Sequence, residues 1–433
     1  MTRRSFLASL GVAAAQTSTR PNIVIIVADD LGIGDLGCYG AADAKTPNLD
    51  RLAVDGVRFT DFHANSPVCS PSRASLLTGK YPQRCGIPQI LFSKPDFSSV
   101  KGLRAGETTL PGELKKQGYR TAAIGKWHLG TAPESRPLKQ GFDSFFGFYS
   151  GWIDYYSHRY YTLGGQPVFH DLWRDDTEVW HEPEYQTELL TREAKAFIAK
   201  QTGPYFLYVA YGAAHYPMMA PKKYLDRFPV SMDRDRRLHL AVVAALDDAA
   251  GEIRAAVGKN TCIFFMSDNG ATHEVRADHR GRPYEGGSNR PYRGWKGSLF
   301  EGGTRVPALM TWPGVARPGD VSEPLAAIDI APTFIRSSPF DGTDISAVLQ
   351  RRSPLTERAL FWEYDGQIAT RKGRWKLLTS HREFLNGPLT ESDWLSDLSS
   401  DPGETKNVAA AHPDVVSSLK AEIAVWKRKN DQK

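Results

Sequence analysis

Four apolar runs of strand length restrict the folds that this chain can adopt. They are NIVIIVADD (residues 22–30), YRTAAIGKWH (119–128), PYFLYVAYGAAH (204–215) and TCIFFMSDN (261–269). None of them alternates polar and apolar residues, so each fits a strand that is covered on both faces, as in a parallel sheet. Segments with helical spacing lie between the runs, including 188–200 and 238–257. The alternation predicts an α/β fold in which helices flank a large, mostly parallel sheet.

The last part of the chain has a different pattern. Three short segments between residues 358 and 380 are typical of antiparallel strands, and residues 414–429 are typical of a closing helix. We therefore expect a main domain at residues 21–340 and a small C-terminal subdomain, an antiparallel sheet plus a helix, at residues 341–433.

The first fifteen residues, MTRRSFLASLGVAAA, resemble a twin-arginine export signal. Arg3 and Arg4 precede an apolar run that is too short to span a bilayer and ends in small residues suited to cleavage. We assign residues 1–20 to an export signal and linker, which implies a bacterial protein that is periplasmic or secreted. No later stretch is apolar for long enough to indicate stable membrane insertion. The formal net charge is only +5, which does not favour binding to nucleic acid.

Polar residues stand at the end of each apolar run. They are Asp29 and Asp30 in the first, Lys126 and His128 in the second, His215 in the third, and Asp268 and Asn269 in the fourth. Taken singly, an Asp after a strand is usually a turn or cap residue, and a lone His is usually a surface or core residue. In open α/β sheets, however, ligands bind beyond the carboxyl ends of the strands. The repeated pattern predicts that these side chains meet in one site.

The residue types at these run ends favour a hard cation. Carboxylate and amide oxygens, without matching Cys or His spacing, suit calcium or magnesium. We expect one ion, with ligands from Asp29, Asp30, Asp268 and Asn269. Further fixed positive charge would come from Arg73, Lys126 and Lys296. Such a site is suited to a tetrahedral oxyanion.

The cysteines are few and show no zinc-binding spacing. Cys262 lies in the apolar run TCIFFM and is expected to be a core residue. Cys38 and Cys85 could pair in an oxidising compartment, although their positions in the sequence do not decide it. Cys69 is followed by Ser70 and Pro71, which we interpret as the N-cap and first residue of a helix. Cys69 would then stand at the positive end of that helix, where anions bind.

A plain thiolate fits this position poorly, because it is a soft ligand beside a site for a hard cation. The chemistry favours an oxygen at position 69. The segment CSPSRASLLTGKYP (69–82) resembles the C-x-P-S-R motif of the type I sulfatases, members of the alkaline phosphatase superfamily. The similarity continues in family order through PNIVIIVADDLGIGDLGCYG, TPNLDRLAVDGVRFTDFH, AAIGKWHLG, HYPMMAP, SDNG and RGWKGSLFEGGTRVPALMTWPG, and it covers nearly the whole chain.

The resemblance implies an alkaline-phosphatase-like fold, a catalytic sulfatase domain at residues 21–340 and sulfuric ester hydrolase activity. In type I sulfatases the motif cysteine is oxidised after translation to formylglycine. The resemblance therefore implies that modification at Cys69 and a formylglycine-generating, or sulfatase-maturating, enzyme as a partner. The hydrated aldehyde would supply the oxygen nucleophile, and its second hydroxyl would let the covalent sulfate ester collapse by elimination.

The resemblance also implies a role for each candidate site residue. The ligands of one Ca²⁺ would be Asp29, Asp30, Asp268, Asn269 and modified Cys69. Arg73 would hold the formylglycine, and His128 would remove a proton from its second hydroxyl. Sulfate binding or help to the leaving group would come from Lys126, His215 and Lys296. We assign the leaving-group acid to His215 and sulfate binding to Lys296, with the reverse assignment as the alternative.

Two features bear on the substrate. Residues 142–161 contain ten aromatics in twenty positions, which could form a platform for a sugar or pack in the core. Trp295 replaces a smaller residue that is common in type I sulfatases, and we expect it to narrow the site. We favour a sulfated carbohydrate as substrate. The alternatives are a phosphodiesterase or phosphonate hydrolase of the same superfamily, or a non-catalytic protein that binds sulfated glycans through an unmodified Cys69.

Overall fold

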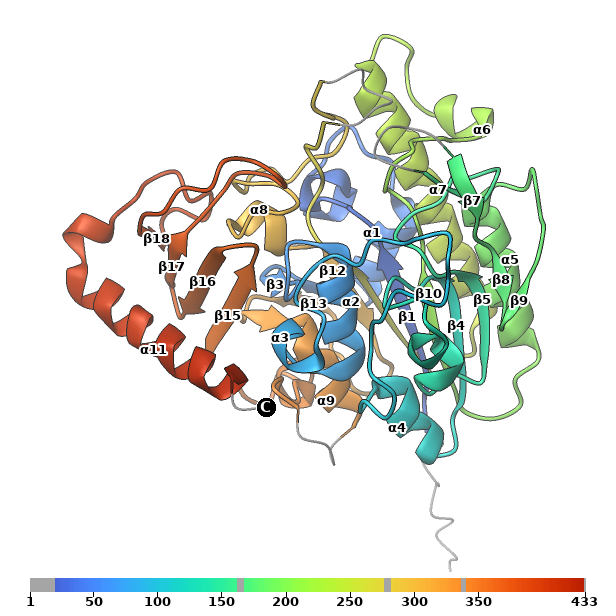
Figure 1. The fold of residues 1–433 in the computed structure, drawn as a ribbon, viewed down its shortest axis with the longest axis horizontal. Helices are drawn as coiled ribbons and strands as arrows, with labels where there is room; N and C mark the ends of the chain where they lie inside the picture. Colours follow the sequence, from blue (N-terminus) through green and yellow to red (C-terminus); the bar gives the residue numbers. More distant parts are fainter. Residues whose placement is uncertain (1–19, 162–166, 276–281, 336–339, 432–433) are drawn as a thin grey trace, which may run out of the picture.

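A ten-stranded mixed sheet forms the centre of the computed structural model, which describes residues 20–161, 167–275, 282–335 and 340–431 (Figure 1). The five central strands, which run parallel, are in order β11 (Thr261–Ser267), β1 (Asn22–Ala28), β10 (Tyr205–Ala210), β4 (Arg120–Lys126) and β5 (Ser144–Phe148). The first four of these are the four apolar runs, so the sequence predicted the centre of the sheet.

The predicted sheet, parallel in most of its pairings, has antiparallel pairs toward both edges. Beyond β11 lie β12 (Ala308–Thr311), β2 (Val57–Phe59) and β13 (Gly319–Val321), and beyond β5 lie β8 (Trp173–Arg174) and β9 (Thr177–Glu178). Of the pairings at these edges, only that of β13 with β2 is parallel. These strands are two to four residues long. A turn of two residues joins β8 and β9, which antiparallel pairing permits.

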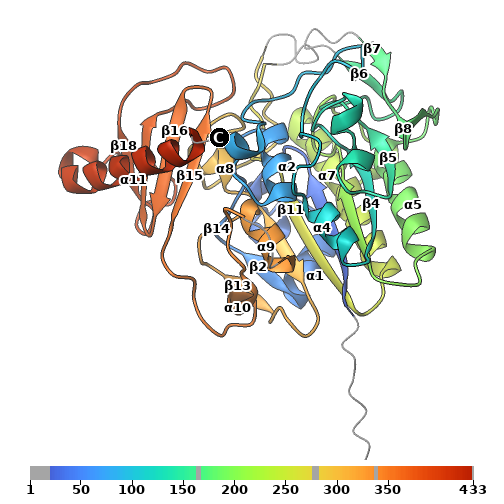
Figure 2. The same cartoon turned by 60° about the horizontal axis from the view of Figure 1, so that its bottom comes forward.

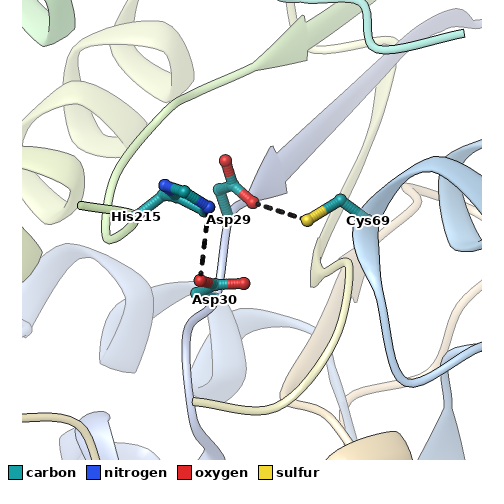
Figure 3. A group of neighbouring side chains, drawn as sticks. All are labelled: Asp29, Asp30, Cys69 and His215. Carbon is teal, nitrogen blue, oxygen red and sulfur yellow. Dashed lines mark hydrogen bonds and ion pairs between the residues drawn. The ribbon is translucent and has the colours of Figure 1, made fainter. Parts of the chain in front are cut away.

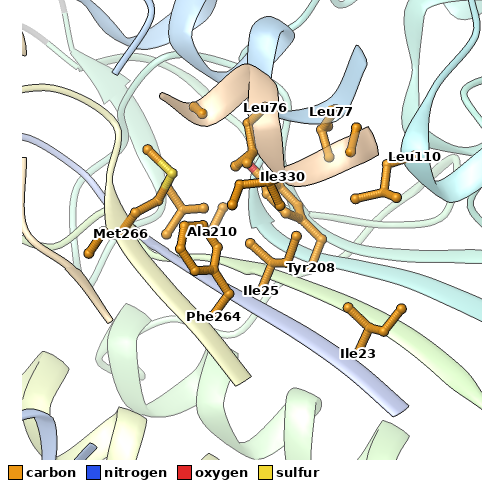
Figure 4. Close-up of a cluster of buried hydrophobic side chains, with 14 of the residues drawn as sticks. Ile23, Ile25, Leu76, Leu77, Leu110, Tyr208, Ala210, Phe264, Met266 and Ile330 are labelled. Carbon is orange, nitrogen blue, oxygen red and sulfur yellow. The ribbon is translucent and has the colours of Figure 1, made fainter. Parts of the chain in front are cut away.

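Side chains from β1 alternate between two separate cores, which explains the unbroken apolar run. Ile23, Ile25 and Val27 pack against α2 (Cys69–Thr78), α4 (Leu110–Lys116) and α9 (Ile330–Phe334), as Figure 4 shows. Val24, Ile26 and Ala28 pack against α1 (Pro47–Asp55), α5 (Gln186–Ala199) and α7 (Arg234–Ala256) on the other face. Because both faces are covered, every position from Ile23 to Ala28 is apolar.

The predicted helices 188–200 and 238–257 correspond to α5 and α7. The second of them begins at Arg234, earlier than predicted. The Asp233 side chain accepts hydrogen bonds from the backbone N–H groups of Asp235 and Arg236, both at 3.0 Å, and so caps the helix. The periodic apolar pattern begins only after this polar first turn, and the prediction therefore started too late.

A four-stranded antiparallel sheet and a long helix form the C-terminal part, beside the main sheet in Figure 2. The strands are β15 (Ala359–Tyr364), β16 (Gln367–Lys372), β17 (Trp375–Ser380) and β18 (Trp394–Asp397), and the helix is α11 (Pro413–Asp431). The sequence predicted this architecture except for β18. Trp362 of β15 packs in one apolar cluster with Val68 and Phe300 of the main domain, so the two parts share a core.

Buried ion pairs also join the C-terminal sheet to the main domain. Asp61 accepts two hydrogen bonds of 2.6 Å from Arg371, and Lys376 donates one of 2.8 Å to Glu301. The Asp61 and Glu301 carboxylates are thus neutralised by basic side chains, which makes this cluster a structural contact between the two parts.

Shorter elements complete the described chain. The remaining strands are β3 (Phe62–His63), which pairs with β14 (Leu325–Ala326), and β6 (Arg159–Tyr161), which pairs with β7 (Pro167–His170). The short α-helices are α3 (Pro82–Cys85), α6 (Lys222–Leu225), α8 (Glu301–Thr304) and α10 (Ser346–Leu349). Short 3-10 helices cover Ile33–Asp35, Gly37–Tyr39, Pro133–Ser135, Pro137–Lys139, Ala327–Asp329 and Ala409–Ala411.

The proposed export signal lies outside the described residues. Within residues 20–431, apart from the three internal gaps, no helix has the length and apolar character needed to cross a membrane.

Candidate active site

The polar residues at the strand ends do meet beyond the carboxyl edge of the central sheet. Asp29 follows β1, and its carboxylate lies 3.5 Å from the Cys69 sulfur (Figure 3). The same carboxylate lies 2.6 Å from the Lys126 ammonium at the end of β4. Asp268 follows β11, and its Oδ1 accepts a hydrogen bond of 3.2 Å from the backbone N–H of Asp30. The convergence predicted from the sequence is therefore present.

Asp30 lies at the centre of a second group of contacts. Its φ angle of 58° places it in the left-handed region, a conformation that costs a non-glycine residue on the order of 1–3 kcal/mol and occurs often at functional sites. Its carboxylate accepts a hydrogen bond of 2.8 Å from the Asn269 amide and lies 2.8 Å from the Lys296 ammonium. The His215 Nε2 lies 3.6 Å from the same carboxylate. Asp30 thus joins residues from three other segments.

Arg73 is fully buried beside the acidic residues. Its guanidinium contacts Asp268 Oδ2 through Nε at 2.8 Å and Nη2 at 2.6 Å, and lies 3.7 Å from Asp29 Oδ1. Burial alone would raise the pKa of Asp268, but the charges of Arg73, Lys126 and Lys296 together outweigh it and lower that pKa. Asp268 is therefore an ionised carboxylate at neutral pH.

The site fits a divalent cation. The Asn269 side-chain oxygen is buried and has no hydrogen-bond partner among the residues that the structure describes, a situation that costs about 1–3 kcal/mol unless a ligand compensates. Burial raises the pKa of Asp29 to about 7, against the charge of Lys126, and a bound cation would restore its ionised form.

The charges of the site lead to the same conclusion. Three carboxylates, from Asp29, Asp30 and Asp268, face three basic side chains, from Arg73, Lys126 and Lys296. These groups balance one another, so a divalent ion would leave the surplus positive charge that an anionic substrate needs. Possible ligand atoms of Asp29, Asp30, Cys69 and His215 lie within 4.8 Å of one another. The sequence predicted the first three of these as ligands and His215 as an acid.

Cys69 is the first residue of α2, which corrects the prediction for this helix. Val68, in an extended conformation, stands at the N-cap position, and the helix begins two residues before Pro71. The Ser70 hydroxyl does not cap the helix but accepts a hydrogen bond of 3.1 Å from the backbone N–H of Leu91. Cys69 still stands at the positive end of the helix. Burial raises the pKa of its thiol to about 12, so an unmodified thiol would be protonated and weakly nucleophilic at neutral pH.

His128 follows β4 and is held as a neutral imidazole. Its Nε2 lies 2.8 Å from the Leu91 carbonyl oxygen, which can only accept, so Nε2 carries the proton and Nδ1 has the free electron pair. Burial and the charge of Lys126 lower the pKa of His128 well below its usual value. A Cβ at position 151 would lie 2.7 Å from the imidazole ring, so Gly151 is needed beside it. His128 can therefore act as a base through Nδ1.

His215 is held by residues of the aromatic segment, a contact that sequence reasoning missed. The Trp152 ring stacks on the His215 ring with centroids 5.6 Å apart and planes 14° apart. The Tyr155 hydroxyl donates hydrogen bonds to the carbonyls of Gly212 (2.9 Å) and His215 (3.0 Å). The His215 Nδ1 lies 2.7 Å from the Tyr216 carbonyl, which directs Nε2 toward Asp30.

Most of the aromatic segment packs in the core. The buried rings are Phe142, Phe145, Phe146, Phe148, Tyr149, Trp152, Tyr155 and Tyr160. This packing leaves little of the segment for a sugar platform. Clustered aromatics alone could not distinguish the two roles, because the same side chains serve both.

The four cysteines are all free thiols, so Cys38 and Cys85 do not pair in this structure.

Lys296 lies on a loop that three distant segments hold in place. The backbone N–H of Lys296 donates to the Ala271 carbonyl at 2.9 Å, and that of Gly297 donates to the Pro67 carbonyl at 2.8 Å. From the C-terminal sheet, the fully buried Gln367 donates to the Gly297 carbonyl at 2.7 Å. These contacts connect Lys296 with the Cys69 segment, and no local sequence signal indicates Gln367.

Comparisons with known proteins agree with this site. The profile of the Sulfatase family matches residues 21–337. Human arylsulfatase A is 34% identical, with 96% of this chain and 89% of that protein covered. Mouse N-acetylgalactosamine-6-sulfatase is 33% identical, with 92% and 84% covered. The crystal structure of Ps i-CgsB in complex with k-i-k-neocarrahexaose has a TM-score of 0.83 and 31% identity, with 95% and 94% covered.

Proposed function

The chain belongs to the sulfatase family and is a sulfuric ester hydrolase, and from this premise we propose that it removes sulfate from a sulfated carbohydrate. Two similar proteins support the substrate class, since one is named for N-acetylgalactosamine-6-sulfate and the other binds k-i-k-neocarrahexaose. The observation that carries the proposal is the position of Cys69. Cys69 is the first residue of α2 and faces a buried group of carboxylates, an amide oxygen and basic side chains.

We propose formylglycine at position 69 and one calcium ion as the groups that complete the site. Asp29, Asp30, Asp268 and Asn269 would hold the ion together with residue 69, as their oxygen atoms and the uncompensated Asn269 amide suggest. The ion would supply positive charge beside the sulfate, and hydrated formylglycine would supply an oxygen nucleophile. The modification requires a sulfatase-maturating enzyme as partner.

The chain's own residues would position the ester and move protons. Arg73 and Lys126, both buried and held by carboxylates, would provide fixed positive charge beside residue 69. His128 would accept a proton at Nδ1, its free ring nitrogen. As an imidazolium whose Nδ1 proton stays hydrogen-bonded to the Tyr216 carbonyl, His215 would give its Nε2 proton to the departing alcohol and become neutral, and Lys296 would bind the sulfate. General acid or base help of this kind is worth about 10²–10⁴-fold.

We propose further that residues 21–340 form the catalytic domain and residues 341–433 the C-terminal subdomain. The family match, which ends at residue 337, supports this division. Export to the periplasm or beyond, through the twin-arginine motif at Arg3 and Arg4, is also part of the proposal. Changing both arginines to lysine should hold the protein in the cytoplasm. Unchanged export of that variant would contradict this part.

The main test measures sulfate released from sulfated mono- and oligosaccharides by protein produced together with a maturating enzyme. We expect release by the wild type and none by Cys69→Ala. Chelation should remove the activity, and added calcium should restore it. Preferential hydrolysis of phosphodiesters or phosphonates would favour the related hydrolase activity instead. Glycan binding without sulfate release, with an unmodified thiol at position 69, would indicate a binding protein.

A further inference from the structure

A cavity of about 1030 Å³ lies beside the segment that carries Lys296. Its lining includes Tyr39, Arg236, His273, Trp295 and Glu383. None of the residues assigned to catalysis or metal binding lines it. Its volume is at the upper end of the range for pockets that enclose small organic ligands.

Two chain segments connect this cavity with the active site. Trp295 directly precedes Lys296, and His273 follows Asn269 by four residues, so its Cα lies at most about 14 Å from that of Asn269. Asn289, which also lines the cavity, accepts a hydrogen bond of 2.7 Å from the Ala271 N–H and donates one of 3.2 Å to the Gly294 carbonyl. The same two segments therefore form the wall of the site and the wall of the cavity.

Aromatic rings line the part of the cavity wall that includes Trp295, the residue directly before Lys296. The Trp295 and His273 rings stack with centroids 4.9 Å apart and planes 24° apart, and Phe384 packs edge-on against His273 at 5.8 Å. Both Trp295 and His273 are half-buried, so part of each ring remains accessible. An ordered, partly exposed indole is a surface on which the apolar face of a sugar ring can stack.

The charges of the cavity differ from those of the active site. Its ionisable lining residues are Arg236, Arg290 and Arg293 against Asp43, Asp233, Glu285 and Glu383. Arg236 pairs with Asp43 at 2.9 Å, and Arg293 pairs with Glu383 at 2.5 Å. Because the acids outnumber the arginines among the described lining residues and two arginines are already paired, these residues supply no surplus positive charge for a second sulfate.

We propose that this cavity binds an uncharged sugar residue linked to the sulfated sugar in the active site. The preferred substrate is then an oligosaccharide whose sulfated unit is joined to an unsulfated neighbour. This inference rests on the proposed function, because it extends the substrate of the same site. Trp295 determines specificity by stacking on the neighbouring sugar, and the paired ions around it disfavour a neighbour that is itself sulfated.

The experiment compares kcat/KM for three substrates: a sulfated monosaccharide, the same unit in a trisaccharide with unsulfated neighbours, and the same unit with sulfated neighbours. Stacking of one ring predicts about a tenfold advantage for the second substrate over the first. The third substrate should have no such advantage. Equal values for the first two substrates, or a preference for the third, would overturn the inference. Absence of sulfate release from every substrate would contradict the proposed function instead.

Variants of the lining residues test whether the preference for the trisaccharide arises in the cavity. Trp295→Ala should reduce the trisaccharide-to-monosaccharide ratio of kcat/KM to about one, and His273→Ala should reduce it in the same direction. Trp180→Ala is the matched control, because Trp180 is 58% exposed and does not line the cavity, and it should leave the ratio unchanged.

An unsulfated disaccharide should also inhibit the wild type competitively and inhibit Trp295→Ala more weakly. This second readout does not depend on how well the variant turns over. An unchanged ratio and unchanged inhibition in both cavity variants would exclude the cavity as the sugar site.

Discussion

Asp29, Lys126 and Asp268 stand at the ends of three central strands of the main sheet, whereas Lys296 stands on a loop outside it. The positions of the first three follow from backbone pairing and from a core on each face of the sheet. The position of Lys296 depends on hydrogen bonds to Pro67, Ala271 and the C-terminal sheet. We call these the strand-end half and the loop half of the site. The edge of the sheet holds the charged side chains rigidly. The loop is held by a few hydrogen bonds, so its sequence, and with it the contacts to a substrate, can differ without a change in the sheet.

Removing a charge from the strand-end half should have the largest effect. Asp268→Ala leaves Arg73 buried without its closest partner, which should abolish turnover and lower the free energy of unfolding by about 3–5 kcal/mol. Denaturant unfolding and sulfate release measure both effects. The control is Asp320→Ala, which breaks a more exposed pair with Arg58 and should cost at most about 1 kcal/mol. Similar stability losses in the two variants would contradict the assigned importance of the buried pair.

His215 and Lys296 test whether the two halves have different chemical roles. His215→Ala should slow hydrolysis of a carbohydrate sulfate about 10²–10⁴-fold but affect an activated aryl sulfate much less, because a sugar alkoxide needs the proton when it leaves. Lys296→Ala should reduce kcat/KM for both substrates by similar factors. The opposite pattern would identify Lys296 as the acid and place this role in the loop half.

Gln367 tests whether the C-terminal sheet positions the loop half. Gln367→Ala removes the hydrogen bond to the Gly297 carbonyl and should lower kcat/KM about 10–100-fold through displacement of Lys296. Gln140→Ala is the matched control, since Gln140 is also buried and donates to backbone carbonyls, but in another part of the main domain. Both variants should lose similar stability, and only Gln367→Ala should lose activity. Equal activity losses would mean that the C-terminal sheet contributes stability alone.

The smallest expected effect is a shift in the pH profile of the wild type, which His128 controls. Burial lowers its pKa well below 6.5, so the neutral base persists as the pH falls through that value. The acid limb of kcat/KM that His128 controls should therefore lie below pH 6.5. We would measure kcat/KM between pH 4 and 9, limits that bracket the usual pKa of His, about 6.5. A limb near pH 6.5 that disappears in His128→Ala would show that the imidazole is solvated, in conflict with the structure.

The strand-end half could be predicted from the sequence and the loop half only in part. Continuous apolar runs require strands with both faces covered, and polar residues at their ends must then share one edge. The role of Lys296 in binding sulfate came from the family resemblance, but Gln367 and the contact of Gly297 with Pro67 are long-range and leave no local pattern. The stacking of Trp152 on His215 could not be predicted either, because aromatic residues that pack in the core and those that contact the active site have the same sequence pattern.

Local rules also failed where a tertiary contact competed with them. Ser70 and Pro71 have the composition of a helix start, yet the Ser70 hydroxyl bonds to Leu91 and the helix begins at Cys69. Likewise, β18 follows a long connection after β17, and pairing with β17 rather than its own composition makes it a strand.

The central claim is that the buried site around Cys69 works through a modified residue. Mass spectrometry of the peptide that contains position 69, taken from fully active enzyme, tests it most directly. We predict an aldehyde in place of the thiol, in a fraction that rises with specific activity across preparations. An unmodified thiol throughout a fully active preparation would contradict the account.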